Sequence, residues 1–108
     1  MADKTNQLIR KIVISTGVVT TVAGINSPEA ITTDGTNLYV ADLSNHLIRQ
    51  IVISTGAVTT VAGTGSIGST DNTTGTSASF YSPTGITTDG TNLYVSEYVN
   101  HLIRKIVL

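Results

Sequence analysis

The 108-residue sequence contains no cysteine and no tryptophan, only two prolines, and few charges, which make up 12% of its residues. The lack of cysteine excludes a disulfide framework and a metal site built on thiolates. The formal net charge is −1, and the six Lys and Arg residues are scattered, so the basic stripe of nucleic-acid-binding proteins is absent. No apolar run approaches the roughly 18 residues of a transmembrane helix. We therefore expect neither a nucleic-acid partner nor a membrane.

The first seven residues, MADKTNQ, lack the apolar segment of a signal peptide. This observation leaves the localisation open. No motif for a cofactor is present, and two histidines without cysteine fall short of the three or four convergent ligands that zinc requires. We expect no cofactor and no metal.

Hydrophobic residues nevertheless make up 40% of the chain, and Thr, Val and Ile are frequent in it. These residue types favour pleated, half-buried backbone. No segment shows a helical period over ten residues. The composition therefore predicts an all-β protein.

The sequence repeats itself. Residues 2–24 and 41–63 are identical at 18 of 23 positions, and residues 96–108 follow the same pattern. Residues 27–40 and 82–95 are identical at 12 of 14 positions. The period is 39 residues between Asn6 and Asn45 and 55 between Asn45 and Asn100, because only one connector, 64–82, is long. Periods of about 40–50 residues are typical of propeller blades.

Each repeat is expected to contain four short strands separated by turns. Asp-Gly at 34–35 and 89–90 predicts a hairpin between the first two strands, and Ser-Thr-Gly at 15–17 and 54–56 predicts one between the last two. The expected strands are 31–33 and 86–88 (first), 38–40 and 93–95 (second), those starting at Leu8, Leu47 and Leu102 (third), and 18–23 and 57–62 (fourth).

The third strand is apolar on both of its faces. One face of the strand that starts at Leu47 carries Arg49, Ile51 and Ile53, and the other carries Ile48, Gln50 and Val52. A sheet with one wet face would alternate more cleanly. This strand therefore belongs to a sheet covered on both sides, as propeller blades are.

Linked motifs in a fixed order resemble the NHL-repeat family. They are N-H-L-I-R at 45–49 and 100–104, D-G-x-N-L-Y-V at 34–40 and 89–95, and P-x-G-I at 83–86. Departures are Gln7 in place of His, Ala30 in place of Gly, and Glu97 in place of Asp. The resemblance implies a β-propeller, usually six-bladed, with four antiparallel strands per blade and the first strand lining a central channel. It also implies binding of proteins or RNA on one rim, and metal-dependent peptide amidation in one subgroup.

The chain is expected to hold about two blades. Residues 1–26 form a part blade with the third and fourth strands, and residues 27–63 form a complete blade. After the connector 64–82, residues 83–108 form a part blade with the first three strands, which gives nine strands in all. Two blades cannot close a ring, because propellers have about four to eight.

We therefore expect the chain to be its own partner, through head-to-tail homo-oligomerisation. The C-terminal strands of one copy would meet the N-terminal fourth strand of the next and complete a blade. A homotrimer would give six blades, the usual number in the resembling family, and a homotetramer would give eight. The third strand occurs at both chain ends, at 8–14 and 102–108, and only one can occupy the junction blade. The sequence does not choose between the two.

Candidate site residues fall into two groups. Repeat-signature residues are expected to serve the blade itself, with a carboxylate pairing with the Arg seven positions later: Asp42, Asn45, His46, Arg49, Asn100, His101 and Arg104. Channel or rim contacts are expected from turn carboxylates, first-strand hydroxyls and two less regular aromatics: Thr32, Asp34, Thr87, Asp89, Tyr81 and Tyr98.

No catalytic constellation is present, so we expect no enzyme. The first functional hypothesis is a self-assembling propeller fragment that acts as a structural or binding scaffold. The near-identical copies favour an excised or designed fragment. The alternative is a ligand- or protein-binding module of a bacterial surface or periplasmic NHL protein, with the connector 64–82 as a rim loop. The sequence does not identify a natural ligand.

Overall fold

The computed structural model describes residues 1–108 and contains ten β-strands, two short 3-10 helices and no α-helix. The strands form three antiparallel sheets, which we call the N-terminal, central and C-terminal sheets. The expected all-β fold built from four-stranded antiparallel blades is confirmed. No helix is long and apolar enough to cross a bilayer.

The central sheet is the one complete blade, with its strands in chain order. Its strands are β4 (Pro28–Thr33), β5 (Asn37–Asp42), β6 (Leu47–Val52) and β7 (Val58–Ala62). The Asp-Gly and Ser-Thr-Gly hairpins lie where the sequence predicts them. Gly35 and Gly56 adopt φ of +93° and +74°, a conformation that side chains with a Cβ disfavour.

The two flanking sheets have three strands each. The N-terminal sheet consists of β1 (Ala2–Asp3), β2 (Leu8–Ile12) and β3 (Val19–Gly24). The C-terminal sheet consists of β8 (Pro83–Thr88), β9 (Asn92–Glu97) and β10 (Leu102–Val107). Because β10 is the last strand of its sheet, one of its edges has no strand beside it.

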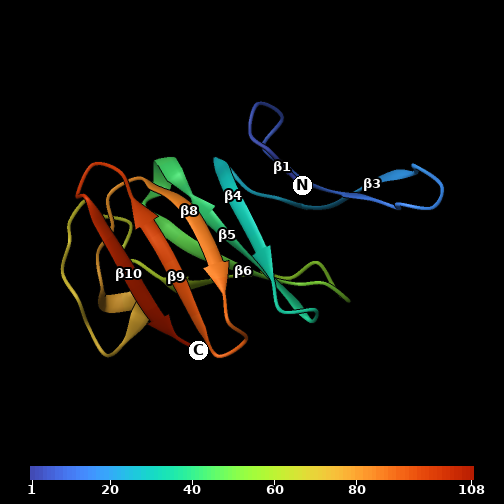
Figure 1. Ribbon diagram of the computed structural model, residues 1–108. Helices are drawn as coiled ribbons and strands as arrows, with labels where there is room; N and C mark the ends of the chain where they lie inside the picture. Colours follow the sequence, from blue (N-terminus) through green and yellow to red (C-terminus); the bar gives the residue numbers. More distant parts are fainter.

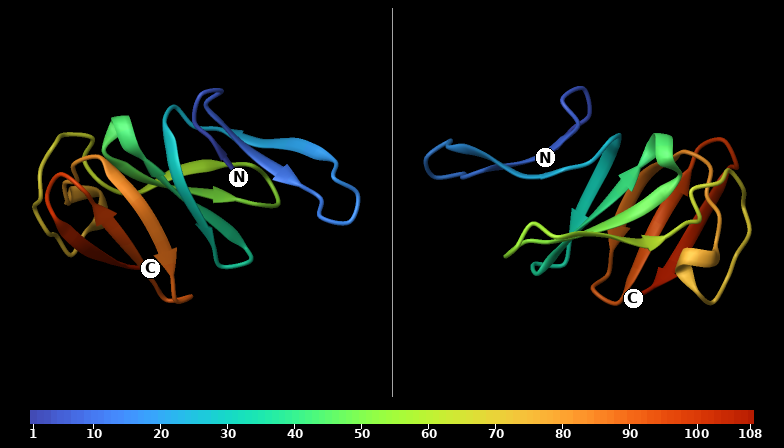
Figure 2. Two further views of the ribbon diagram at one scale, coloured as in Figure 1. Left: turned by 45° about the horizontal axis from the view of Figure 1, so that its top comes forward. Right: turned by 180° about the vertical axis from the view of Figure 1, so that it is seen from behind.

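The three sheets are arranged side by side, with the central sheet in the middle (Figures 1 and 2). On one side, Tyr39, Ala41 and Ile48 pack against Leu93 and Val95 of the C-terminal sheet. On the other side, Val40 and Ile51 pack against Ile9 of the N-terminal sheet. Successive residues of β5 thus enter different cores, which explains why β5 and β6 are apolar on both faces.

Three details differ from the expectation. A tenth strand, β1, pairs Ala2 with Ile9, because Ala2–Asp3 corresponds to the end of the second strand in the other repeats. The first strand begins three residues earlier than expected, at Pro28 and Pro83. Short 3-10 helices form at Leu43–Asn45 (η1) and Gly75–Ser77 (η2).

Candidate functional site

Each sheet contains the Arg–carboxylate pair expected from the seven-residue spacing. The closest N–O distances are 3.4 Å for Arg10–Asp3, 3.1 Å for Arg49–Asp42 and 2.9 Å for Arg104–Glu97. The carboxylates of Asp42 and Glu97 are buried, so each depends on its Arg and Asn partners for compensation. These pairs hold the second strand to the third within one sheet.

Arg104 is held more completely than its equivalents. Its guanidinium donates to Glu97 and Asp71 and to the carbonyl oxygens of Ser79 and Thr70, at 2.9–3.0 Å. It also lies 4.8 Å from the ring centroid of Phe80. The connector 64–82 is thereby fastened to β10. The role of Asp71 was not predicted, because its segment occurs once and has no repeat to compare with.

Arg10 is the least well held of the three. It makes one long contact with Asp3, and its buried Nε atom has no hydrogen-bond partner. In Arg49 the same atom donates to Asp42, and in Arg104 it donates to Asp71. The N-terminal copy of the third strand is therefore the weakest one.

The two histidines occupy equivalent left-handed turns, with φ of 57° at His46 and 55° at His101. His46 Nδ1 accepts a hydrogen bond of 2.9 Å from the backbone N–H of Ser82, and its ring meets that of Tyr81 edge-on. This bond links the central sheet to the start of the C-terminal sheet. His101 is exposed and lies beside Tyr98.

The two turn aspartates are occupied by their own hairpins. One carboxylate oxygen of Asp89 accepts from the N–H groups of Thr91 and Asn92, and the other accepts from the hydroxyl of Tyr94. These backbone hydrogen bonds lower the pKa of Asp89 to about 2, and the equivalent bonds from Asn37 and Thr36 lower the pKa of Asp34. Burial and the neighbouring Asp34 carboxylate raise the pKa of Tyr39.

The remaining rim candidates do not converge on one site. Thr32 lies half-buried on β4, and Thr87 is exposed on β8. Tyr98 is 78% exposed, whereas Tyr81 is half-buried against His46 rather than free on the surface. No group of three or more His, Asp or Glu side chains in the chain could hold a metal ion.

The most distinctive surfaces are the outward faces of the two end sheets. Ile48 and Ile103 occupy the same repeat position, but Ile48 is fully buried and Ile103 is 73% exposed. At another position, Ile51 is fully buried and Ile12 is 48% exposed. The outward face of the C-terminal sheet thus exposes apolar positions that are buried on one face of the central sheet. The outward face of the N-terminal sheet exposes positions that are buried on the other face of the central sheet.

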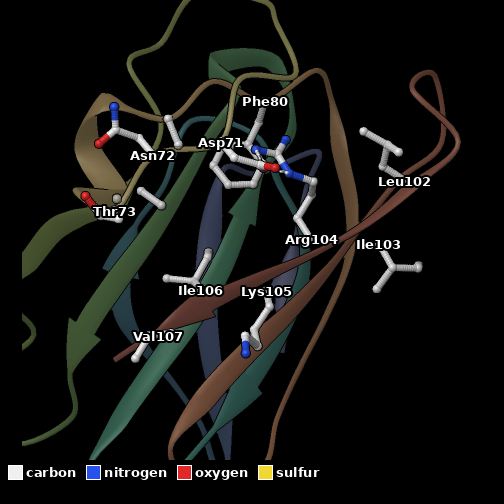
Figure 3. A pocket seen from close by; sticks show the side chains of 13 residues that line it. Asp71, Asn72, Thr73, Phe80, Leu102, Ile103, Arg104, Lys105, Ile106 and Val107 are labelled. Atoms are coloured by element: carbon white, nitrogen blue, oxygen red, sulfur yellow. Dashed lines mark hydrogen bonds and ion pairs between the residues drawn. The ribbon is translucent and has the colours of Figure 1, made fainter.

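A groove of about 940 Å³ runs along the free edge of β10 (Figure 3). The six residues of β10 line it on one side, and Asp71, Asn72 and Thr73 of the connector line it on the other. Ala62, Ala78 and Phe80 contribute an apolar wall. In the central sheet, the corresponding edge of β6 is occupied by β7. The groove therefore lies where a fourth strand would complete the C-terminal sheet.

No family model and no curated protein matches the sequence, but solved structures match the fold. A structural-genomics protein of unknown function from Bacteroides thetaiotaomicron superposes with a TM-score of 0.88 at 25% identity over 99% of this chain. An auxiliary nutrient-binding protein from the same organism superposes with a TM-score of 0.70 at 23% identity over 91%. A chain of a nidogen–laminin complex superposes with a TM-score of 0.71 at 15% identity over 94%.

This chain spans only 31%, 31% and 34%, respectively, of the lengths of those three chains. It thus corresponds to about a third of each of them. The matching structures are β-propeller-like, and the chain has the fold of a β-propeller segment.

Proposed function

We propose that this chain is a non-catalytic propeller module of the NHL type, which assembles head to tail with copies of itself into a closed scaffold. The observation that carries the proposal is the opposite burial of identical residues. Ile103 is exposed where Ile48 is buried, and Ile12 is exposed where Ile51 is buried. Each open face therefore resembles a face that the central sheet buries. When the C-terminal sheet of one copy and the N-terminal sheet of the next merge into one blade, a central sheet would cover each side of it.

Apolar exposure of this kind supports a partner. Val107 and Ile103 are 71% and 73% exposed on the C-terminal sheet, and Val19 and Ile12 are 46% and 48% exposed on the N-terminal sheet. Three copies would make a ring of six blades and four copies a ring of eight, both within the usual range. We favour the trimer, and the tetramer is the next candidate.

Light scattering after size exclusion tests this proposal. We expect a discrete mass of three or four chains. Ile103→Lys should shift the mass to that of one chain, because it places a charge in the contact between copies. Ile14→Lys is the matched control, since Ile14 is 99% exposed in a hairpin turn, and it should leave the mass unchanged. A monomer at all concentrations of the unmodified protein would contradict the proposal.

A second candidate function is ligand binding at the rim, through the connector 64–82. It is supported by the long, hydroxyl-rich connector and by the likeness to a protein described as nutrient-binding. Thermal-shift screening with sugars, amino acids and short peptides would test it. A variant in which Ile-Asn, the short connector of residues 25–26, replaces residues 64–81 should lose any stabilisation. An unchanged response in that variant would place binding elsewhere.

A further inference from the structure

The groove beside β10 lies where the central sheet has its fourth strand, β7. We propose that it is a strand-accepting site and that its occupant is Val19–Gly24 of a second copy of this chain. This inference rests on the proposed assembly and specifies how one junction of that assembly is made. In the free chain, Val19–Gly24 is β3 and pairs with β2.

The first argument is sequence identity between the two strands that could hold Val19–Gly24. Residues 8–13 and residues 102–107 both read LIRKIV. One copy, in β2, already pairs with β3, and the other, in β10, presents the same edge to the groove. A strand that recognises the first copy therefore recognises the second with the same side chains and backbone groups.

The second argument is the register. β3 pairs on β2 with Ile9 opposite Ala23 and Lys11 opposite Thr20. β7 pairs on β6 in the equivalent way, with Ile48 opposite Ala62 and Gln50 opposite Thr59, and both pairs of strands share the same register shift. Transferred to β10, this register places Ala23 opposite Ile103 and Thr20 opposite Lys105.

The third argument decides which copy of LIRKIV stays in the junction. Arg104 anchors β10 through Glu97, Asp71 and two carbonyl oxygens, whereas Arg10 of β2 has a single long contact and an unpartnered Nε. Removing β10 would leave the buried Glu97 carboxylate without its Arg104 partner, which would destabilise the folded state. Displacing β2 breaks at most the long Arg10–Asp3 contact, and the partly exposed Asp3 carboxylate also accepts a hydrogen bond from Asn6. The strand that is displaced is therefore β2.

The exchange also replaces the apolar contact that β2 makes. Ile9 is fully buried against the central sheet, and its equivalent in β10 is Ile103, which is exposed in the free chain. When β10 of one copy takes the place of β2 of the next, Ile103 enters the site that Ile9 leaves. The strands β9 and β8 then follow, and they cover the half-exposed Leu38 and Ile31 beside it.

Cysteine pairs test the exchange, because the natural chain contains no cysteine. Thr20→Cys/Lys105→Cys places thiols on directly opposed residues of two copies, at a separation that a disulfide can bridge. We expect oxidation to link the chains into covalent oligomers on a denaturing, non-reducing gel. An equimolar mixture of the two single variants should give the mixed dimer.

The matched control is Lys11→Cys/Thr20→Cys, which locks β3 onto β2 within one chain through an identical local geometry. We expect the oxidised control to lose the oligomer mass and to regain it on reduction. An oligomer that survives this lock, without cross-linking of the Thr20→Cys/Lys105→Cys protein, would overturn the strand exchange but leave assembly standing. A monomeric unmodified protein would overturn both proposals.

Discussion

At the residue scale, the surroundings of a side chain decide its contribution more than its identity does. Arg10 and Arg104 lie in identical hexapeptides, yet Arg104 has four hydrogen-bond partners and Arg10 has one. Burial of Glu97 makes the difference, because a buried carboxylate that loses its cation has no water to replace it.

We therefore predict that Arg104→Met lowers the free energy of unfolding by about 3 kcal/mol, in the range for breaking a buried ion pair. Arg10→Met is the matched control and should cost less than ~1 kcal/mol, because its single contact is long and partly exposed. Chemical denaturation at one fixed protein concentration measures both. Equal losses of unfolding free energy in the two variants would show that the additional partners of Arg104 contribute nothing beyond what Arg10 already has.

Asp89 gives a prediction for acid conditions. Its pKa is lowered from 3.8 to about 2 by hydrogen bonds from Asn92 and Thr91, so the folded state favours the charged form. The stabilisation by this carboxylate is fully present above the unfolded pKa and is lost as the pH falls through the folded pKa. We expect an NMR titration of the Asp89 carboxyl carbon to have its midpoint near pH 2. A midpoint near 4 would contradict the turn geometry.

The same carboxylate can be tested by substitution. Asp89→Asn keeps an oxygen that can accept from Thr91 and Asn92, so it should preserve the turn and remove the acid-dependent step. Asp89→Ala removes both acceptors and should destabilise the β8–β9 hairpin at neutral pH. Thermal unfolding of the two variants at pH 7 and pH 3 separates the hydrogen bond from the charge.

At the element scale, the long connector is an insertion in an otherwise regular repeat. Aligned backward from Ser27 and Ser82, Phe80 takes the place of Ile25, and both are buried in the core between two sheets. The 16 residues 64–79 are the inserted part. They begin after Gly63, where a Cβ would come within 2.7 Å of the backbone oxygen of His46 and where φ is +101°. The insertion thus lies between Gly63 and Phe80, two residues whose surroundings in the blade constrain them.

This correspondence predicts the effect of changes at Phe80. Phe80→Ala should lower the free energy of unfolding by about 3–5 kcal/mol, because it leaves a cavity between the central and C-terminal sheets. Phe80→Ile should cost clearly less, since Ile fills the equivalent place at position 25. Denaturant midpoints of the two variants give the comparison, and similar losses for both would contradict the correspondence.

Most of the blade could be predicted from the sequence, because the same turn residues and the same spacing of charged and apolar residues recur in each repeat. The hairpins at Asp34-Gly35 and Asp89-Gly90 and the Arg–carboxylate pairs follow from recurring spacing. The partnership of Asp71 with Arg104 could not be predicted, because the connector occurs once and its path depends on the packed sheets. The different exposure of Ile9 and Ile103 could not be predicted either, since the neighbouring sheet decides it and the hexapeptides are identical.

At the scale of the whole molecule, the chain has one complete blade between two incomplete ones. Only the central sheet is covered on both sides, so the end sheets depend on contacts outside the chain in the proposed assembly. Stability and association are then linked, because anything that binds only the folded state stabilises it by mass action.

We predict that the thermal midpoint rises with protein concentration. The effect should be strong in the unmodified protein and absent in Ile103→Lys, whose folded monomer keeps the same internal cores. Differential scanning calorimetry over a hundredfold range of concentration measures this dependence. A midpoint that does not change with concentration in the unmodified protein would contradict the prediction, because it would show that assembly does not stabilise the fold.

The single long connector has a consequence for how such a ring would meet its surroundings. Because it follows only one of every two blades, a ring of three chains would display three identical loops at intervals of one third of a turn. A surface that carries several copies of a group to which one loop binds weakly would then be bound by three loops at once. Such trivalent attachment can exceed the strength of one loop by orders of magnitude without any new contact within a loop.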